Sequence, residues 1–354
     1  MSYPLADFIH AVRPRVDARL LPPSTLDVAQ QAGQWFPFVR DVQFRCRLAA
    51  HAPLASVVLR LCRADAARAS LPEDASGPGL HRVLDAFQEP SHALFLAGEL
   101  VTVEVPAPPV SGANEGLTIH VPLSRQIGMA RRTADALFEE VLDARHANAA
   151  QATMRHCFEW SREGGPVDRV GFGLMAHEPF IAVRMVNVVA SALPALLDRL
   201  GLAAEEPAIS DTASWLSMSG RLGVNVTLFS DQSALVGLAC HPGGRAAERH
   251  ERVMDALEWR GLLDHETRAS LTRWEGRDSA RAERLRGTLL GRALNRLPPA
   301  SEASFTRRIS HFDVLVPSVA GSEATQAVRR TEAIVEIAVG CELTRSERSQ
   351  SLYP

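Results

Sequence analysis

The sequence predicts an α+β fold, a closed antiparallel β-barrel built from repeated αββα units with the helices outside. Three observations predict it. Short segments of alternating polar and apolar residues occur in pairs, a longer segment with helical spacing follows most pairs, and the scheme recurs roughly three to five times. No single unit can close a hydrophobic core. Hairpins with helices on one side satisfy their edges by closing into a barrel, whose inner face carries polar residues.

Four strands are expected in the first half of the chain, over residues 41–48, 55–63, 93–105 and 117–123. The first shows the pattern most clearly, because Val42, Phe44 and Cys46 alternate with Gln43 and Arg45. Residues 71–80 contain Pro, Gly, Asp and Ser and are expected to form a loop. Residues 124–149 carry apolar side chains at helical spacing and are expected to form a helix.

The second half repeats the scheme. Strands are expected over 169–176, 180–186, 223–229, 234–240 and 305–316, and also at the C-terminal end of 325–339. Helices are expected over 190–200, 245–260, 265–274 and 279–296. We expect a single barrel domain over 1–354, with an N-terminal helical lead-in over 1–40 and a flexible C-terminal tail over 341–354.

All 38 basic residues are arginines, because the sequence contains no lysine. This excludes Schiff-base and pyridoxal-phosphate enzymes, Walker A nucleotide loops and Ser-x-x-Lys acyl enzymes. Any anionic substrate must therefore be bound by Arg, His or backbone N–H groups. Only two tyrosines occur, Tyr3 and Tyr353, at the two ends of the chain.

The charge balance and the cysteines predict which partners and which compartment to expect for the protein. With 41 acidic residues the net charge is -3, so no overall positive field draws the chain to nucleic acid or anionic lipid. The five cysteines include no C-x-x-C pair, which favours a reducing, cytoplasmic setting. No segment has the roughly 18 apolar residues of a membrane-spanning helix, and no secretory signal is present.

Two local motifs carry little weight. Residues 171–176 match G-x-G-x-x-A, but a strand follows where a dinucleotide-binding motif needs a helix, so we interpret them as a tightly packed strand. Cys240-His241 and His311-x-Asp313 have spacings too weak to predict a metal site, and none is expected.

Several arginines lie in or beside predicted strands. A guanidinium on a strand must face water, pair with a carboxylate such as Asp41 or Glu336, or bind an anion, because unpaired burial is costly. If they converge on a lumen, they can bind a diphosphate or carboxylate. The candidate substrate-binding residues of this kind are Arg45, Arg60, Arg184, Arg221 and Arg308.

Alternating ββα units around a barrel resemble the prenyltransferase barrel, or ABBA fold, whose members include enzymes that prenylate peptides and indoles. Residues 309–314 (ISHFDV) look like a late strand of such proteins, and Arg184 and Arg308 lie in strand contexts where that family has basic diphosphate ligands. The family typically also uses lysines for the diphosphate and tyrosines to shield the allyl cation. In this chain Arg and His would have to bind the diphosphate alone.

The resemblance implies prenyl transfer from an allyl diphosphate to an aromatic or peptide acceptor. Under this first hypothesis the strand arginines bind the leaving diphosphate, and Glu104 orients or deprotonates the acceptor. A lumen aromatic residue, Trp160 or Trp215, would stabilise the carbocation face-on. No cofactor is expected, although a magnesium ion is compatible with a diphosphate donor.

Two alternatives remain open. In the second hypothesis the barrel modifies a peptide or another small natural product without an isoprenoid donor, and His311 and Asp313, on one strand face, act as a base and its partner. In the third hypothesis the chain is a non-catalytic subunit that presents a peptide to a partner enzyme. A former prenyltransferase that has lost its activity would be expected to lack these Lys and Tyr residues.

Overall fold

The computed structural model describes most of the chain. The described residues are 2–48, 55–71, 73–106, 117–142, 144–175, 178–229, 234–241, 246–280, 288–296, 302–316 and 331–344.

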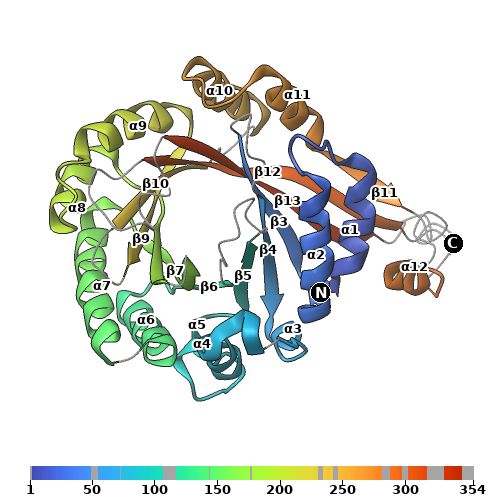
Figure 1. Cartoon of the computed structure of the whole chain (residues 1–354), viewed down its shortest axis with the longest axis horizontal. Helices are drawn as coiled ribbons and strands as arrows, with labels where there is room; N and C mark the ends of the chain where they lie inside the picture. Colours follow the sequence, from blue (N-terminus) through green and yellow to red (C-terminus); the bar gives the residue numbers. More distant parts are fainter. Residues whose placement is uncertain are drawn as a thin grey trace, which may run out of the picture.

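Ten of the described strands close into an antiparallel barrel (Figure 1), which confirms the predicted fold class. They are β3 (Asp41–Arg47), β4 (Ala55–Cys62), β5 (Leu100–Pro106), β6 (Thr118–Pro122), β7 (Val167–Met175), β8 (Glu178–Met185), β9 (Arg221–Phe229), β10 (Ala234–His241), β12 (Glu302–Val316) and β13 (Glu332–Thr344). From β3 to β10 each strand pairs with the next one, and the pairings β10–β12, β12–β13 and β13–β3 complete the circle.

Helices surround the strands (Figure 1). They are α1 (Leu5–Val12), α2 (Pro23–Trp35), α3 (Arg63–Ala66), α4 (Glu73–Ala86), α5 (Ala93–Ala97), α6 (Ile127–Val141), α7 (Ala144–Gly164), α8 (Leu193–Arg199), α9 (Glu206–Ser219), α10 (Ala246–Trp259), α11 (His265–Trp274) and α12 (Leu289–Leu294). Short elements are the 3-10 helices η1 (Arg13–Arg15) and η2 (Ala190–Ala192) and a two-stranded sheet of β1 (Tyr3–Pro4) and β2 (Phe38–Val39).

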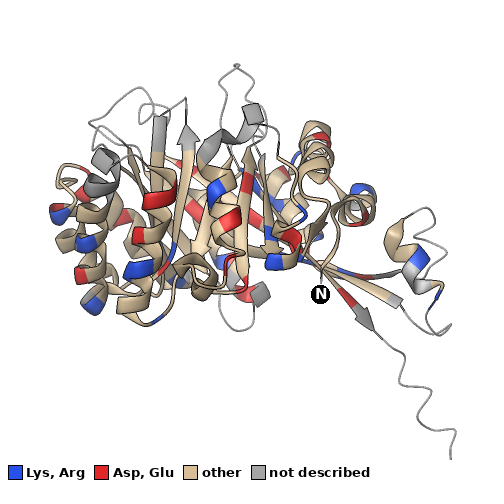
Figure 2. Cartoon of the chain, turned by 90° about the horizontal axis from the view of Figure 1, so that it is seen from below, with Lys and Arg blue, Asp and Glu red and all other residues tan. Residues whose placement is uncertain are grey.

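The hydrophobic core lies between the helices and the outer face of the barrel. In β3, Val42, Phe44 and Cys46 point into this core, and at most 1% of each is exposed. Gln43 and Arg45 alternate with them on the other face, as the sequence pattern predicts. Acidic and basic residues are interspersed over the helices (Figure 2). Within the described residues no helix is both long and apolar enough to cross a membrane.

Two predictions in the first half are wrong. Residues 93–105 are not one strand, because His92 caps α5 by accepting a hydrogen bond from the Leu94 N–H at 3.2 Å, and β5 begins only at Leu100. Residues 73–80 are not a loop but the start of α4, whose Leu80, Val83 and Leu84 are buried at helical spacing.

Other differences concern boundaries. The helix expected over 124–149 is two helices, since α6 ends at Val141 and α7 begins at Ala144. The helix expected over 279–296 is wrong at its start, because residues 279 and 280 belong to β11 (Gly276–Ala280), which pairs with β12. Residues 281–287 lie outside the described part of the chain. Helix α12 lies within the rest of the predicted range. Helix α9 was not predicted. Residues 341–344, assigned to the tail, belong to β13 and pair with β12, whereas 345–354 lie outside the described residues.

Strand β12 carries an irregularity that positions the lumen residues. Its pairing with β13 shifts between Ile309 and His311, so Ser310 is an extra, bulged residue. Before the bulge, Phe305 and Ile309 face the outer core; after it, Phe312 and Val314 do. The bulge therefore switches the faces of the strand. Its first half, with β11 and the end of β13, extends away from the barrel (Figures 1 and 2).

Candidate active site

A cavity of about 240 Å³ lies in the barrel lumen, and side chains from all ten barrel strands line it. The structure places five of the predicted residues in its wall: Arg45, Glu104, Arg184, His311 and Asp313. They come from β3, β5, β8 and β12, so residues far apart in the sequence meet here.

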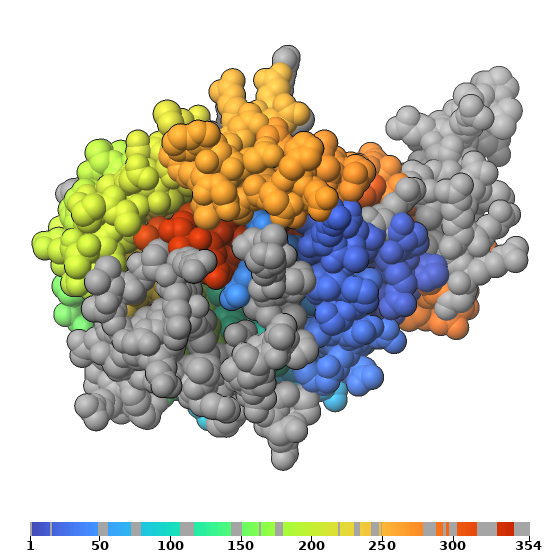
Figure 3. All heavy atoms as spheres, turned by 45° about the horizontal axis from the view of Figure 1, so that its top comes forward, coloured from blue at the N-terminus to red at the C-terminus, as the bar shows by residue number. Residues whose placement is uncertain are grey.

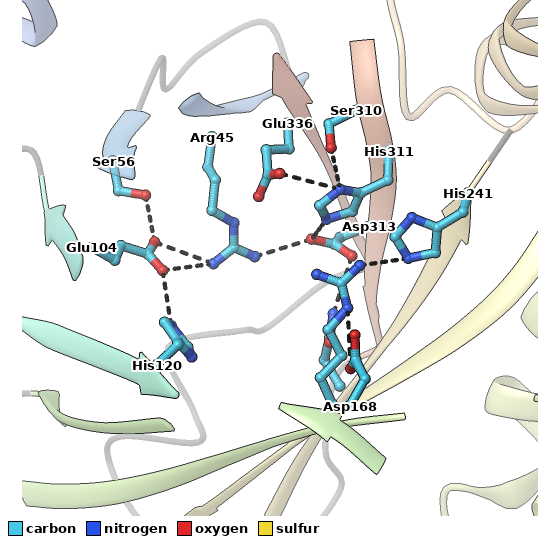
Figure 4. A network of polar contacts seen from close by, with 12 residues as sticks. Arg45, Ser56, Glu104, His120, Asp168, His241, Ser310, His311, Asp313 and Glu336 are labelled. Carbon is cyan, nitrogen blue, oxygen red and sulfur yellow. Dashed lines mark hydrogen bonds and ion pairs between the residues drawn. The ribbon is translucent and has the colours of Figure 1, made fainter. Parts of the chain in front are cut away.

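Arg45 is the centre of a polar network on one side of the cavity (Figure 4). Its Nη1 donates to both carboxylate oxygens of Glu104 at 3.2 Å, and its Nη2 donates to Asp313 Oδ2 at 3.1 Å. A single guanidinium therefore joins two carboxylates from opposite parts of the chain. These contacts raise the pKa of Arg45, although burial acts against this.

Glu104 has partners at both carboxylate oxygens. Ser56 Oγ donates to Oε1, and His120 Nε2 lies 3.6 Å from Oε2. Burial opposes ionisation of Glu104, but the Arg45 charge and the hydrogen bonds from His120 and Ser56 outweigh it, so the pKa lies far below the usual range. Burial lowers the pKa of His120. At neutral pH this corner therefore holds an ionised carboxylate beside a neutral imidazole.

His311 lies between two carboxylates (Figure 4). Its Nε2 is 3.3 Å from Asp313 Oδ2, and its Nδ1 is 3.4 Å from Glu336 Oε1. Asn225 donates to the other oxygen of Asp313 at 3.1 Å. Burial acts against ionisation of Asp313, but the His311 and Arg45 contacts prevail and depress its pKa strongly. The side chains of His311 and Asp313 are almost completely buried, at 3% and 2% exposed.

The other side of the cavity is basic and incompletely paired. Arg169 and Arg184 are cross-strand neighbours on β7 and β8. Arg184 Nη2 lies 2.7 Å from His241 Nε2, and its Nε is 3.9 Å from Asp168 Oδ1. For Arg169, no side-chain hydrogen bond or ion pair occurs among the described residues, and burial and the Arg184 charge lower its pKa.

His241 stays neutral in this basic group. Burial, with the charges of His311 and Arg184, lowers the pKa of His241 to about 3. Its ring lies against that of His311, with 4.8 Å between centroids, and so links the two sides of the cavity (Figure 4). Because a neutral imidazole nitrogen accepts hydrogen bonds, His241 Nε2 accepts from Arg184.

Two glycines of β7 make room for this arrangement. Gly171 and Gly173 share the inner face with Arg169, as the period of two requires. A Cβ at Gly171 would lie 2.3 Å from His120 Nδ1, and one at Gly173 would lie 2.5 Å from the Phe180 ring. The G-x-G pattern thus gives a tightly packed strand, as interpreted from the sequence, whose missing side chains leave space for His120 and Phe180.

A small apolar cluster, separate from the main core, adjoins the polar groups. It consists of Phe180, Phe229 and Leu235, with Ala182 and Leu315 packed against it. All of these except Phe229 line the cavity. The lumen therefore combines a polar part with an apolar part.

The remaining predicted residues lie outside the cavity. Arg60 pairs with Asp41 at 3.0 Å, and Arg221 and Arg308 are exposed. Trp160 is on α7 and donates to the Ala192 carbonyl, and Trp215 is on α9 and stacks with Arg260. Both tryptophans are buried outside the barrel, because their helices pack on its outer face, so neither is a lumen aromatic residue.

Sequence reasoning did not single out Arg169, His120, Asn225 or Glu336 as site residues. The sequence could have indicated Arg169, because Arg169, Gly171 and Gly173 alternate along one face of a strand. The two glycines, which have no side chain, leave space on the face that carries the arginine. The pattern around His120 is weaker, because the strand is short and only the alternation along it indicates that His120 faces inward.

Comparison with known proteins gives the same architecture. No family model and no curated protein matches the sequence. The structure is similar to that of AnaPT from Neosartorya fischeri, with a TM-score of 0.54 and 11% identity over 96% of this chain and 92% of that one. It is also similar to 5-dimethylallyl tryptophan synthase from Streptomyces coelicolor in complex with DMASPP and Trp, with a TM-score of 0.54 and 12% identity over 100% and 98% of the chains.

Both similar structures are aromatic prenyltransferases, and the matches extend over nearly the whole of each chain. The closed ten-stranded barrel confirms the resemblance inferred from the sequence. The chain has the ABBA prenyltransferase-barrel fold.

Proposed function

We propose that the protein transfers a prenyl group from an allyl diphosphate to an aromatic or peptide acceptor inside the barrel. The observation that carries this proposal is the Arg169 guanidinium, which faces the cavity beside Arg184 without a carboxylate partner among the described residues. The fold supports it, because two structures with the same barrel are aromatic prenyltransferases.

Arg169 and Arg184 bind the diphosphate. Two neighbouring guanidinium groups repel one another, and an anion between them removes this repulsion and supplies hydrogen-bond acceptors to both. The same groups stabilise the charge that develops on the diphosphate as its bond to the allyl carbon breaks. His241 lies within hydrogen-bond distance of Arg184 and orients it.

The apolar cluster binds the hydrocarbon part of the donor. Phe180 lines the cavity and presents an aromatic ring, which can stabilise an allyl cation face-on. This assigns to Phe180 the role that the sequence suggested for Trp160 or Trp215. At about 240 Å³ the cavity lies below the usual pocket range of roughly 300–1,000 Å³, which favours a short prenyl chain.

Glu104 orients the acceptor. Its low pKa keeps Glu104 ionised at neutral pH, so the carboxylate is a weak base that can accept a hydrogen bond from an N–H or O–H group of the acceptor. As the carbon–oxygen bond of the donor breaks, a bond forms between the acceptor atom and the allyl carbon. The acceptor then loses a proton to the Glu104–His120 pair, in which His120 is neutral at neutral pH.

The experiment is calorimetric titration of the full chain with inorganic pyrophosphate and with dimethylallyl diphosphate, with and without magnesium. Arg169→Met is expected to weaken both by about 10- to 100-fold. Arg221→Met, which removes an exposed arginine outside the cavity, is the matched control and should bind like the wild type. Equal affinity of the Arg169 and Arg221 variants would refute the donor site.

Turnover is tested with dimethylallyl diphosphate and a panel of indoles, tryptophan and aromatic peptides, with products identified by mass spectrometry. A product carrying one prenyl group that is lost in Glu104→Gln supports the enzyme. Pyrophosphate binding without any product, together with capture of a peptide and a partner enzyme, would favour the non-catalytic subunit instead.

A further inference from the structure

A hydrogen-bonded pair of a buried histidine and a partly exposed glutamate lies on the outer side of the barrel, away from the cavity. His250 of α10 is 3% exposed, and its Nδ1 donates to Glu275 Oε2 at 3.2 Å. The hydrogen bond from His250 lowers the pKa of Glu275 against the effect of burial, so the carboxylate is ionised at neutral pH. Glu275 directly follows α11, and α10 and α11 form one continuous block over this side of the molecule (Figure 3).

The other oxygen of Glu275 contacts the main chain of the barrel. Oε1 accepts a hydrogen bond from the backbone N–H of Ile309 at 3.3 Å. Ile309 directly precedes the bulge at Ser310 in β12. A backbone N–H in this buried place needs an acceptor, and Glu275 supplies it in place of a strand.

The contact falls where β12 changes neighbours. Along one edge, residues 303–307 of β12 pair with β11 and residues 312–316 pair with β10. Neither strand covers the four residues between them. The carboxylate of Glu275, the residue just before β11, occupies this gap, and the His250 ring lies edge-on to Phe312 at 6.1 Å between centroids. Glu275 and His250 thus contact β12 on both sides of the bulge.

The bulge decides which side chains of β12 enter the lumen. Ile309 faces the outer core, and His311 and Asp313 face the cavity. We propose that Glu275, held by His250, is a positioning residue: it fixes the Ile309 amide at the bulge and thereby sets the direction in which His311 and Asp313 project into the cavity. This inference concerns the empty protein and does not rest on the proposed donor or reaction.

The test compares two substitutions of similar size in the full chain. Glu275→Gln keeps an oxygen that accepts from Ile309, whereas Glu275→Met removes it. Glu266→Met, which removes an exposed carboxylate from α11, the helix that Glu275 follows, is the matched control. The readout is the His311 ring signal in a two-dimensional ¹H–¹⁵N spectrum, identified by its loss in His311→Gln. Hydrogen exchange of the Ile309 amide is measured alongside.

We expect Glu275→Met to displace the His311 ring signals and to speed exchange of the Ile309 amide by about tenfold, since one hydrogen bond is lost. Glu275→Gln and Glu266→Met should keep the wild-type His311 signals. Wild-type His311 signals in Glu275→Met would overturn the proposal. Equal displacement of these signals in Glu275→Gln and Glu275→Met would also overturn it, because the lost charge, and not the lost hydrogen-bond acceptor, would then be the cause.

A second variant covers the case in which Glu275→Met does not fold. His250→Phe keeps an aromatic ring against Phe312 and removes only the donor to Glu275 Oε2. We expect a smaller displacement of the His311 ring signals and slower exchange at Ile309 than in Glu275→Met. Unchanged His311 signals in His250→Phe would contradict the proposed role of the pair.

Discussion

The two sides of the lumen differ in how their charges are matched. On one side, Arg45 contacts Glu104 and Asp313, and every charged group has a partner within 3.6 Å. On the other side, among the described residues, Arg184 contacts one carboxylate at 3.9 Å and a neutral imidazole, and Arg169 has no partner. One cavity thus contains a compensated and an uncompensated group of arginines.

The difference separates arginines that stabilise the fold from arginines that are available to bind an anion. A guanidinium already bound to carboxylates belongs to the framework, because its removal leaves the anions unpaired. A guanidinium without a partner is held in place by the rest of the fold at a cost in free energy, which a bound anion offsets. We therefore expect the loss of Arg45 to affect stability and the loss of Arg169 to affect anion binding.

The largest effect is expected for Arg45→Met. Two ionised, buried carboxylates would lose their shared cation, and the free energy of unfolding should fall by about 3–5 kcal/mol. Urea denaturation measures it. Arg47→Met is the control two residues along the same strand, since Arg47 is one-third exposed and its carboxylate partner among the described residues is Glu332 at 3.4 Å. It should change stability by less than about 1 kcal/mol. Equal losses in the two variants would remove the distinction between framework and surface pairs.

A smaller loss in the free energy of unfolding is expected for Gly171→Ala. The new methyl group would collide with the His120 ring and push it away from Glu104, so we expect a loss of about 1–3 kcal/mol in urea denaturation. Gly201→Ala is not a suitable control, because its backbone has a positive φ of 73°. Gly128→Ala, with no atom near the added Cβ, serves instead and should not destabilise the fold. A Gly171→Ala protein as stable as Gly128→Ala would show that His120 is not held against β7.

The pH dependence tests whether His241 is neutral. The pKa of His120 on the other side is lowered too and contributes to the same loss of stability, so the test uses a His241 variant. The pKa of His241 is about 3 in the folded state, and an unfolded histidine titrates near 6.5. As the pH falls from about 6.5 towards 3, the unfolded chain gains a proton that the folded chain does not, so stability decreases. The lowered pKa values of Glu104 and Asp313 add to this loss only below about 4. In His241→Gln, stability measured between pH 7 and 5 should therefore fall less steeply, and an unchanged slope would contradict a neutral His241.

The smallest effect on stability is expected for Arg169→Met. Removing a partly buried cation that has no partner among the described residues should leave the free energy of unfolding unchanged or raise it by up to about 1 kcal/mol, while pyrophosphate affinity falls. The two measurements together contrast with Arg45→Met. A destabilisation of Arg169→Met as large as that of Arg45→Met would show that Arg169, too, belongs to the framework.

Local patterns predicted the barrel well, because alternation along a strand depends only on neighbouring residues. The face assignment of Val42, Phe44 and Arg45 is confirmed, and His311 and Asp313 share one face of β12, as predicted, which here lines the cavity. The strand boundary at Leu100 was missed, because Ala93–Ala97 is as apolar as a strand and only the His92 cap identifies it as a helix.

The pairing inside the cavity could not be predicted, because it depends on closure of the barrel. Arg45 is 59 residues from Glu104 and 268 residues from Asp313, and no sequence spacing relates them. Trp160 and Trp215 were assigned to the lumen for a similar reason. An apolar residue on a helix outside a barrel and one inside it give the same local pattern, and only the positions of α7 and α9 distinguish them.

The extra residue at Ser310 offsets the alternation of β12 by one position. A straight strand that kept Ser310 would exchange the sides of Phe312 and Val314 with those of His311 and Asp313. It would bring apolar side chains into the wet interior and a charged pair into the dry layer beneath the helices. Loss of the Ser310 codon would instead leave His311 opposite Glu336, next to the pairing of Ile309 with Ile337, so both faces would keep their side chains. Because Ile309 and Phe312 both face outward although they are three residues apart, this sequence can follow the barrel wall only with a bulge between them.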